Sequence, residues 1–384
     1  MRKRRSYGPV SRVAEATWML WNSRCPSLRY RASTSLIGKA KTIYRDKLCS
    51  VFSQHLEYGL LLERGYMKEK HWIYAIVMAA AESLPLLYQK CTRKEILQSV
   101  LAKTSLGASS KLLDNLNDEI HTVEEACNSL ENYLSALVTG VFLKKKKTLV
   151  ERAESASCEM ASWIYHSLDR DTEVFDLYTR DCATLVEGQV LSLQHKRTEW
   201  PSLAEYVGGI AEKSIGDVWI DIDLCSFDHL DRSLVNLKKS NKYIFKSSLV
   251  YDDVQDIYED VQTKSVNSAV VLGLEQGIVT QDDLEEMSPD KVVVLLKEAG
   301  ILKKVIYLAD ALFLKGVDIL KEVDSSYIDM KGLLQSFRLV RLFNLRKLLV
   351  MNKDLWTLKQ FLASFSDFQC LRDQIPVKIF RLVN

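Results

Sequence analysis

Prolines interrupt the chain at only six positions, and two long stretches, residues 86–200 and 202–288, contain none. Because proline ends or kinks an α-helix, stretches without it leave room for long helices. Glycine is also sparse, and no segment shows the turn residues and alternation of a β-hairpin. Apolar residues make up 47% of the chain, a proportion typical of a globular protein with a sizeable core. We therefore predict an all-α protein.

Apolar spacing along the chain predicts the individual helices. The Thr92-Arg-Lys-Glu95 segment has the spacing of a capping box and predicts a helix start, and Pro85 is expected to kink or end the helix before it. We expect a basic N-terminal arm over 1–32, a main helical domain over 33–325 and a helical extension over 326–384. The predicted helices cover residues 33–65, 70–90, 93–105, 107–119, 122–143, 148–168, 171–194, 233–262, 290–300, 302–322 and 327–352.

One stretch, residues 249–260, carries five acidic residues within nine positions. In a helix, Asp252, Asp256 and Asp260 stand at i, i+4 and i+8 and share one face. Like charges at this spacing repel, so the row favours a cation that lies against it. Oxygen ligands held in this way suit Mg²⁺, which keeps several waters and usually shares a substrate phosphate. The alternative interpretation is a solvated acidic face.

A second acidic pair lies earlier in the chain. Asp114 and Asp118 are again four residues apart, and Glu119 follows directly. We expect this pair to lie at the C-terminus of the 107–119 helix. Two acidic helical faces can hold a metal-bound diphosphate between them.

The two acidic stretches together resemble a known superfamily. Residues 252–256 form a complete DDxxD motif, and residues 114–118 form the same motif with Asn115 in its second place. In this order and at this separation, the pair resembles the class I isoprenoid synthase superfamily, which includes trans-prenyl diphosphate synthases, squalene and phytoene synthases and class I terpene cyclases. The resemblance covers about residues 95–320. It implies a helical bundle around a central apolar cavity, with metal ions at the mouth of the cavity.

The resemblance also implies roles for individual residues. Gly188-Gln189, Glu205-Tyr206 and Lys213-Ser214 are similar in order and spacing to three landmarks of trans-prenyl synthases. A lysine at such a site is a point-charge phosphate binder. The implied catalytic carboxylates are Asp114, Asp118, Asp252 and Asp256; the implied ligands of Mg²⁺, three ions with the diphosphate, are these four with Glu119 and Asp253; the implied substrate-binding residues are Asn115, Arg180, Gln189, Lys213 and Asp260.

Two departures from the trans-prenyl synthases bear on the activity. The chain contains no GGKRxRP stretch, which marks the isopentenyl diphosphate site, and Ser248-Leu249 stands where prenyl synthases have Phe-Gln. The first motif is also similar to that of bacterial large-terpene synthases. Our leading hypothesis is a class I terpene synthase that ionises a linear prenyl diphosphate and cyclises or rearranges the cation. The alternatives are a trans-prenyl diphosphate synthase or squalene/phytoene-type prenyltransferase, and a non-catalytic subunit of a heteromeric synthase.

Charge and cysteine usage restrict the partners. The formal net charge is only +2, and the basic clusters lack interleaved aromatic residues, so we expect no nucleic acid. Eight scattered cysteines without a CxxC pair indicate reduced thiols in a cytoplasmic protein. The apolar stretches 72–81 and 133–143 are shorter than the roughly 20 residues of a membrane span, so we expect none. The 327–352 helix is basic through Arg338, Arg341, Arg346 and Lys347. We expect it to pack on the protein, with docking on an anionic membrane as the alternative. By resemblance, the chain is expected to form a homodimer.

Overall fold

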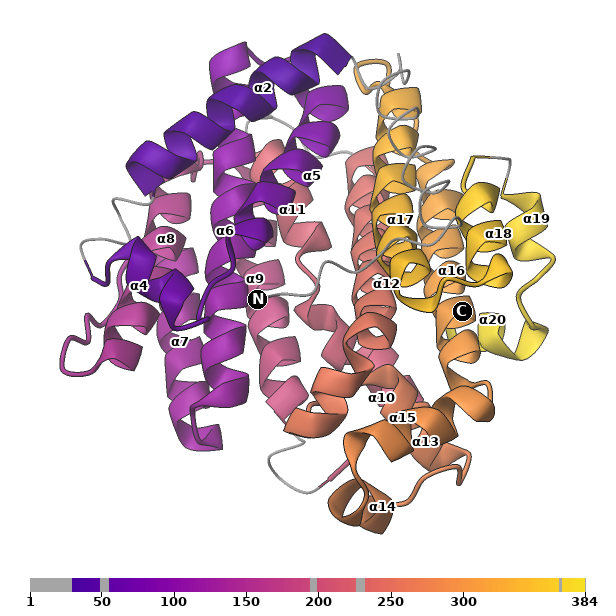
Figure 1. The fold of residues 1–384 in the computed structure, drawn as a ribbon. Helices are drawn as coiled ribbons and strands as arrows, with labels where there is room; N and C mark the ends of the chain where they lie inside the picture. Colours follow the sequence, from indigo (N-terminus) through magenta and orange to yellow (C-terminus); the bar gives the residue numbers. More distant parts are fainter. Residues whose placement is uncertain (1–29, 49–54, 194–198, 226–231, 366–367, 384) are drawn as a thin grey trace.

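The computed structural model of the chain describes residues 30–48, 55–193, 199–225, 232–365 and 368–383. Every regular element in these ranges is a helix (Figure 1), so the all-α prediction is confirmed. The N-terminal arm predicted over residues 1–32 lies outside the described residues, except for its last three, which begin the first described helix.

The first half of the described chain contains one long central helix and several shorter helices around it. Their bounds are α2 (Tyr30–Ile43), the π-helical turn η2 (Tyr44–Leu48), α4 (Tyr58–Glu63), α5 (Glu69–Leu87), α6 (Arg93–Glu119), α7 (Val123–Thr139), α8 (Leu149–Ser167) and α9 (Glu173–Ser192).

The second half is built on the longest helix, α12, which packs along α16 and α17. The bounds are α10 (Leu203–Gly208), the 3₁₀ helix η4 (Ile210–Lys213), α11 (Gly216–Leu224), α12 (Arg232–Thr263), α13 (Ser268–Glu275), α14 (Gln281–Glu286), α15 (Pro289–Glu298), α16 (Ile301–Leu320), α17 (Met330–Asn352), α18 (Leu355–Ala363), α19 (Gln369–Arg372) and α20 (Val377–Val383).

Two helix predictions are wrong. The expected helix over 33–65 ends at Ile43, continues as a π-helical turn, and is followed by the separate helix α4. The expected break between 93–105 and 107–119 is absent, because α6 runs unbroken to Glu119. A glycine inside a helix costs only about 1 kcal/mol relative to alanine, and the close packing of Gly107 on Ala75 of α5 offsets this cost.

Other helix signals are confirmed. Thr92 Oγ1 accepts from the amide of Glu95, and the Glu95 carboxylate accepts from the amide of Thr92, so the predicted capping box starts α6. Helix α5 ends at Leu87, two residues after Pro85. The first acidic pair does lie at the C-terminus of its helix, as predicted.

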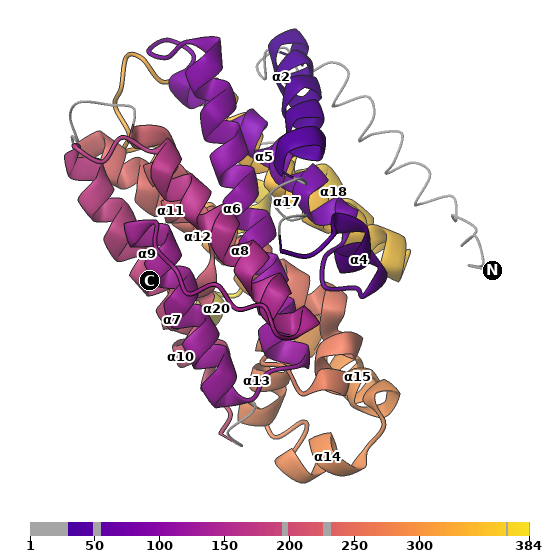
Figure 2. The same cartoon turned by 90° about the vertical axis from the view of Figure 1, so that its left-hand side faces the viewer.

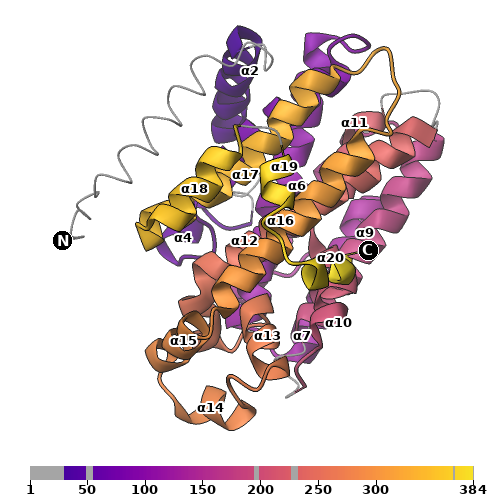
Figure 3. The same cartoon turned by 90° about the vertical axis from the view of Figure 1, so that its right-hand side faces the viewer.

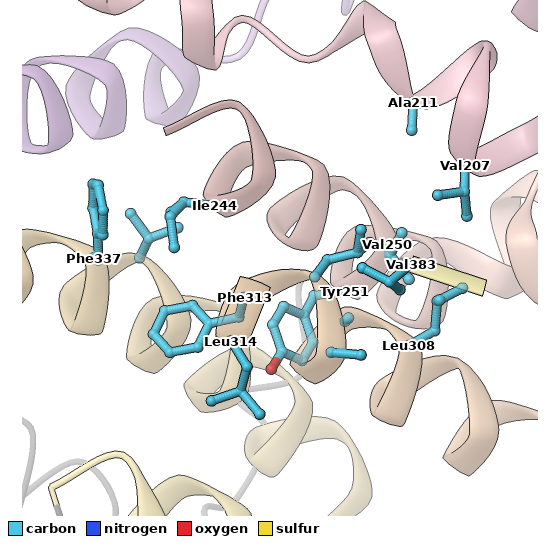
Figure 4. Packing of buried hydrophobic residues seen from close by; sticks show 14 of the residues in the cluster. Val207, Ala211, Ile244, Val250, Tyr251, Leu308, Phe313, Leu314, Phe337 and Val383 are labelled. Atoms are coloured by element: carbon cyan, nitrogen blue, oxygen red, sulfur yellow. The ribbon is translucent and has the colours of Figure 1, made fainter. Parts of the chain in front are cut away.

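Helix α12 lies between two sets of helices. The views from the sides show α6, α7, α8 and α9 on one side of the molecule (Figure 2) and α16, α17, α18 and α20 on the other (Figure 3). Buried hydrophobic side chains of α12 and α16 belong to one cluster, among them Ile244, Tyr251, Leu308 and Phe313 (Figure 4). The backbones approach closely at Gly316, where a Cβ would lie 2.9 Å from the carbonyl oxygen of Ser240.

The residues after 325 share this core. Phe337, Phe361 and Ile379 are buried in the same cluster as α12 and α16. Arg341, expected on a basic face, is buried and pairs with Asp310 at 2.8 Å. The boundary predicted at 325 stays a prediction, although the residues on both sides of it pack together. Of the helices in the described ranges, none combines the length and apolar character that a membrane-spanning segment requires.

A buried ionic cluster lies in the interior between α5, α6 and α11. Lys103 Nζ is 2.9 Å from a carboxylate oxygen of Glu82 and also donates to Asp223. Ser83 and Ser99 donate to the same Asp223 carboxylate. Burial raises the pKa of Glu82, and the positive charge of Lys103 opposes this shift. Because buried charges are tolerated only when paired and hydrogen-bonded, these residues hold one another in place.

Candidate functional site

The second acidic motif presents two carboxylates at the surface of α12. Asp252 and Asp256 are partly exposed, and Lys347 of α17 lies against both of them. Its Nζ is 3.0 Å from Asp252 Oδ1 and 3.5 Å from Asp256 Oδ1. The ammonium therefore bridges two neighbouring turns and offsets the repulsion between their carboxylates.

Asp253 faces the opposite way and braces the motif. Its Oδ2 accepts hydrogen bonds from the hydroxyl of Tyr206 at 2.6 Å and from the amide of Ser268 at 2.9 Å. Burial raises the pKa of Asp253 to about 6, and these hydrogen bonds oppose the shift. Asp253 thus ties α12 to α10 and α13, and its predicted role as a metal ligand stays a prediction.

Asp260 continues the acidic row one turn later. Its Oδ2 accepts from the side-chain amide of Asn267 at 2.7 Å. Burial and the negative charge of Asp253 raise the pKa of Asp260 to about 8. At neutral pH this carboxyl is therefore mostly protonated, and a cation bound nearby would favour its ionised form.

The first acidic motif lies in the last turns of α6. Asp114 pairs with Lys111 of the preceding turn, with 2.6 Å between Nζ and Oδ2. Asn115 donates from its side-chain amide to the carbonyl of Tyr66 at 3.0 Å, a bond that a carboxylate lacking a donor could not make. This bond accounts for asparagine at the second place of the motif. Asp118 is partly buried, and Glu119 is exposed at the helix end.

The two motifs act on common lysines. The pKa of Lys111 is raised by Asp114, and Asp118 and Asp252 of the second motif add to the shift. Burial lowers the pKa of Lys213, but Asp114, Asp118 and Asp253 more than offset this effect. Acidic residues of both helices therefore act electrostatically on Lys213. The fold brings together the two acidic stretches and the lysine that the sequence singled out.

Close backbone packing sets the position of Lys213. A Cβ on Gly188 of α9 would lie 2.3 Å from the backbone nitrogen of Lys213, so only glycine allows η4 to approach α9. The neighbouring Glu212 is held by two lysines of α12, Lys242 and Lys246, the second at 2.5 Å. These contacts fix the turn from which Lys213 extends.

Two other predicted residues have different surroundings. Gln189 is buried and donates to the hydroxyl of Ser110 at 2.9 Å, one turn before Asp114 on α6. Arg180 lies nine residues earlier on α9, about 14 Å along the helix axis. Its side chain is exposed and donates to the carbonyl of Asp176 on its own helix. The structure thus places Gln189 beside the first motif and does not bring Arg180 to it.

Three charged residues of the site lie outside the predicted motifs: Lys111, Lys347 and Glu212. Lys111 stands three residues before Asp114, a helical spacing that could have indicated an ion pair. Lys347 comes from a distant helix, and no local pattern connects it with residues 252–256. Glu212 is the residue before Lys213, but its partners Lys242 and Lys246 lie on α12, about 30 residues later in the chain.

The donor set fits magnesium bound together with a phosphate. In the described ranges, no three acidic, histidine or cysteine side chains already surround a common point. Mg²⁺ is usually held by one or two carboxylates, with waters and substrate phosphates completing its octahedron. Pairs such as Asp114 with Asp118 and Asp252 with Asp256 supply carboxylates in that number. Both acidic stretches act on Lys213, and an ammonium group is chemically suited to phosphate oxygens.

Comparison with known proteins supports the fold. No protein-family model matches the chain, and no curated protein matches it. Among solved structures, the polyprenyl synthetase from Streptomyces coelicolor A3(2) aligns with a TM-score of 0.52 at 14% identity, covering 80% of this chain and 99% of that one. The geranylgeranyl pyrophosphate synthetase from the archaeon Geoglobus acetivorans aligns with a TM-score of 0.46 at 13% identity, covering 78% and 98%. The linalool/nerolidol synthase from Streptomyces clavuligerus, in complex with 2-fluorogeranyl diphosphate, aligns with a TM-score of 0.44 at 10% identity, covering 78% and 99%.

The chain has the all-helical fold of the Streptomyces coelicolor polyprenyl synthetase, as the resemblance of its two acidic motifs predicted. The alignment with the polyprenyl synthetase carries this conclusion, because it spans nearly the whole of that chain. Identity of 14% shows the fold and not the reaction.

The packing of η4 on α9 gives a direct test. Gly188→Ala should lower the free energy of unfolding by about 1 to 3 kcal/mol, because the new methyl group would overlap the backbone of Lys213. Gly208→Ala is the matched control, since no atom lies within 4 Å of its added Cβ. Urea unfolding of both variants measures the difference. Equal stability of the two would contradict the close approach.

The bridge from Lys347 gives a second test. In Lys347→Gln, the carboxylates of Asp252 and Asp256 lose their common ammonium, so Mg²⁺ should raise the unfolding temperature more than it does in the wild type. Without metal, the free energy of unfolding of the variant should fall by about 1 kcal/mol or less, because the ion pair between Lys347 and Asp252 is partly exposed. Lys331→Gln, an exposed lysine on the same helix, is the control. If Mg²⁺ raised the unfolding temperature of Lys347→Gln no more than that of Lys331→Gln, Lys347 and Mg²⁺ would not compete for the two aspartates.

Proposed function

We propose that this protein is a Mg²⁺-dependent class I terpene synthase acting on a linear prenyl diphosphate. One observation carries the proposal: carboxylates at the end of α6, Asp114 and Asp118, and Asp253 of α12 all raise the pKa of the same lysine, Lys213. Acidic residues alone would repel a diphosphate, and lysine alone would not hold a metal. The combination suits a ligand that is an anion bridged to cations.

In this proposal, different residues bind the metal and the diphosphate. Asp114 and Asp118 on one side and Asp252 and Asp256 on the other would hold Mg²⁺, and Lys213 would bind phosphate oxygens directly. Bound magnesium supplies Lewis-acid stabilisation of the leaving diphosphate. The bond between C1 and the diphosphate oxygen breaks, and its electron pair leaves with the oxygen. The allylic cation then cyclises or rearranges and loses a proton or takes up water.

Two lysines of the site, Lys111 and Lys347, could stabilise the negative charge of the leaving diphosphate. In the unliganded site, Lys111 and Lys347 neutralise Asp114, Asp252 and Asp256. If Asp114, Asp252 and Asp256 held a metal, the ammonium groups of Lys111 and Lys347 would be free to bind diphosphate oxygens. They would then stabilise the charge that develops on the leaving group.

A prenyl diphosphate synthase is the second candidate. Its activity is the one named for the polyprenyl synthetase whose fold this chain shares, and that shared fold is compatible with either reaction. The chain lacks the GGKRxRP stretch that marks the isopentenyl diphosphate site of prenyl synthases. This favours the terpene synthase, because an enzyme that only ionises its substrate needs no second diphosphate site.

Product analysis with acidic variants tests the proposal. The protein is incubated with Mg²⁺ and C10 to C35 prenyl diphosphates, with and without isopentenyl diphosphate. We expect hydrocarbons or alcohols without isopentenyl diphosphate. Asp252→Asn and Asp256→Asn should lower turnover about a hundredfold or more, which corresponds to about 3 kcal/mol of lost stabilisation.

The control variant is Glu259→Gln, an exposed acidic residue of the same helix, which should keep wild-type turnover. Elongated diphosphates formed only with isopentenyl diphosphate would establish the prenyltransferase. Absence of any metal-dependent product would reject both enzymes and favour a non-catalytic subunit.

A further inference from the structure

The connection between α7 and α8 folds back along α7. Gly140 ends α7 with a φ of 71°, and a Cβ at this position would lie 2.5 Å from the ring of Tyr165, so only glycine fits the turn. Further on, the amide of Leu143 donates to Asn132 Oδ1 at 2.7 Å, and the carbonyl of Leu143 accepts from Asn132 Nδ2 at 3.0 Å. The side chain of Asn132 thus holds both backbone groups of Leu143.

Two aliphatic side chains of this connection are exposed. Val141 is 68% exposed and Leu143 is 69% exposed, whereas Phe142 between them is partly buried and meets the ring of His55 edge to face at 6.5 Å. The hydroxyl of Ser135 donates to the carbonyl of Val141 at 2.8 Å. The hydrogen bonds of both residues and the packing of Phe142 therefore fix the two aliphatic side chains in an outward direction.

Four lysines, residues 144–147, follow directly. The first two pair with Glu159 at 3.1 Å and with Glu154 at 2.9 Å. Lys146 and Lys147 are exposed, and neither forms an ion pair with any residue that the structure describes. One short segment therefore presents two aliphatic side chains and two uncompensated ammonium groups to the surroundings.

The segment ends near the first acidic motif. Helix α8 runs antiparallel to α6, because Ser157 of α8 donates to the carbonyl of Ser109, while the carbonyl of Ser167 accepts from Gln98. The beginning of α8 therefore lies beside the C-terminal end of α6, which carries this motif. A surface bound by the lysines would lie at the same end of the molecule.

We propose that residues 141–147, the docking segment, bind an anionic lipid bilayer. Val141 and Leu143 would enter the boundary between headgroups and acyl chains, and Lys146 and Lys147 would lie against the negatively charged headgroups. A protein partner is less suited, because a specific interface covers about 800 Å² on each side and needs a complementary face. A bilayer accepts any protruding apolar side chain. Binding of this kind needs neither metal nor prenyl diphosphate, so the inference is independent of the proposed function.

Vesicle flotation with the full chain tests the docking. One set of vesicles contains phosphatidylcholine alone, and the other contains equal parts of phosphatidylcholine and phosphatidylserine. The protein should bind the mixed vesicles about tenfold more tightly, because only these attract the lysines. Equal binding to both sets would overturn the proposal. Absence of binding to the mixed vesicles would also overturn it and leave the docking segment to a protein partner.

A leucine variant tests the apolar contact without changing the net charge. Leu143→Gln should weaken binding to the mixed vesicles about tenfold, because one aliphatic side chain no longer leaves water. The matched control is Leu355→Gln, since Leu355 is 75% exposed on α18, which lies on the other side of the molecule from α7 and α8 (Figure 1). The control should bind as the wild type does. Equal binding by the two variants would contradict the insertion of Leu143.

A lysine variant tests the electrostatic contact. The double variant Lys146→Gln with Lys147→Gln should weaken binding to the mixed vesicles about tenfold. Lys331→Gln with Lys359→Gln removes the same charge from exposed positions of α17 and α18 and is the control. All four side chains are exposed, so both double variants should fold. Equal weakening in the two would show that only the net charge of the protein matters and would overturn the docking segment.

Discussion

Repulsion among carboxylates is the constraint on which the site depends. Asp252, Asp256 and Asp260 stand on successive turns of α12, and such a row destabilises a helix unless cations lie against it. Lys347 forms ion pairs with the first two carboxylates, which reduces their repulsion. The pKa of Asp260 is raised by burial and by the negative charge of Asp253. Under the proposed function, a metal ion would replace Lys347 as the cation next to Asp252 and Asp256. Magnesium with a diphosphate would supply both the positive charge and the anion that the displaced lysines require.

The rest of the fold brings other groups to this row with little freedom. Gly188 lets η4 reach α9, and the backbone of η4 then presents Lys213 between the motifs. Tyr251, the residue before the motif, donates to Asp310, which in turn pairs with the buried Arg341. The C-terminal helices thus fix the start of the motif and also supply Lys347. In the interior, the ion pairs of Lys103 with Glu82 and Asp223 join α6 to α5 and α11.

The sequence revealed the helical class and the two motifs because both depend on local spacing. Helix periodicity and the capping box at Thr92 require only neighbouring residues, and so does the i, i+4 placement of Asp252 and Asp256. The unbroken course of α6 through Gly107 was missed, because tertiary packing outweighs the propensity of one glycine. Lys347 and the inward turn of Asp253 depend on contacts between distant helices. No pattern within one segment encodes which side of α12 faces α17 and which faces α10.

The most direct test of the account is a crystal structure with Mn²⁺ and a prenyl thiolodiphosphate, using anomalous scattering to locate the metal. The account predicts metal ions bound by carboxylates of both α6 and α12, with Lys213 on the diphosphate and Lys347 withdrawn from at least one of its aspartates. Metal on only one of the two helices, or a diphosphate bound away from Lys213, would contradict the claim that the two acidic motifs form one site.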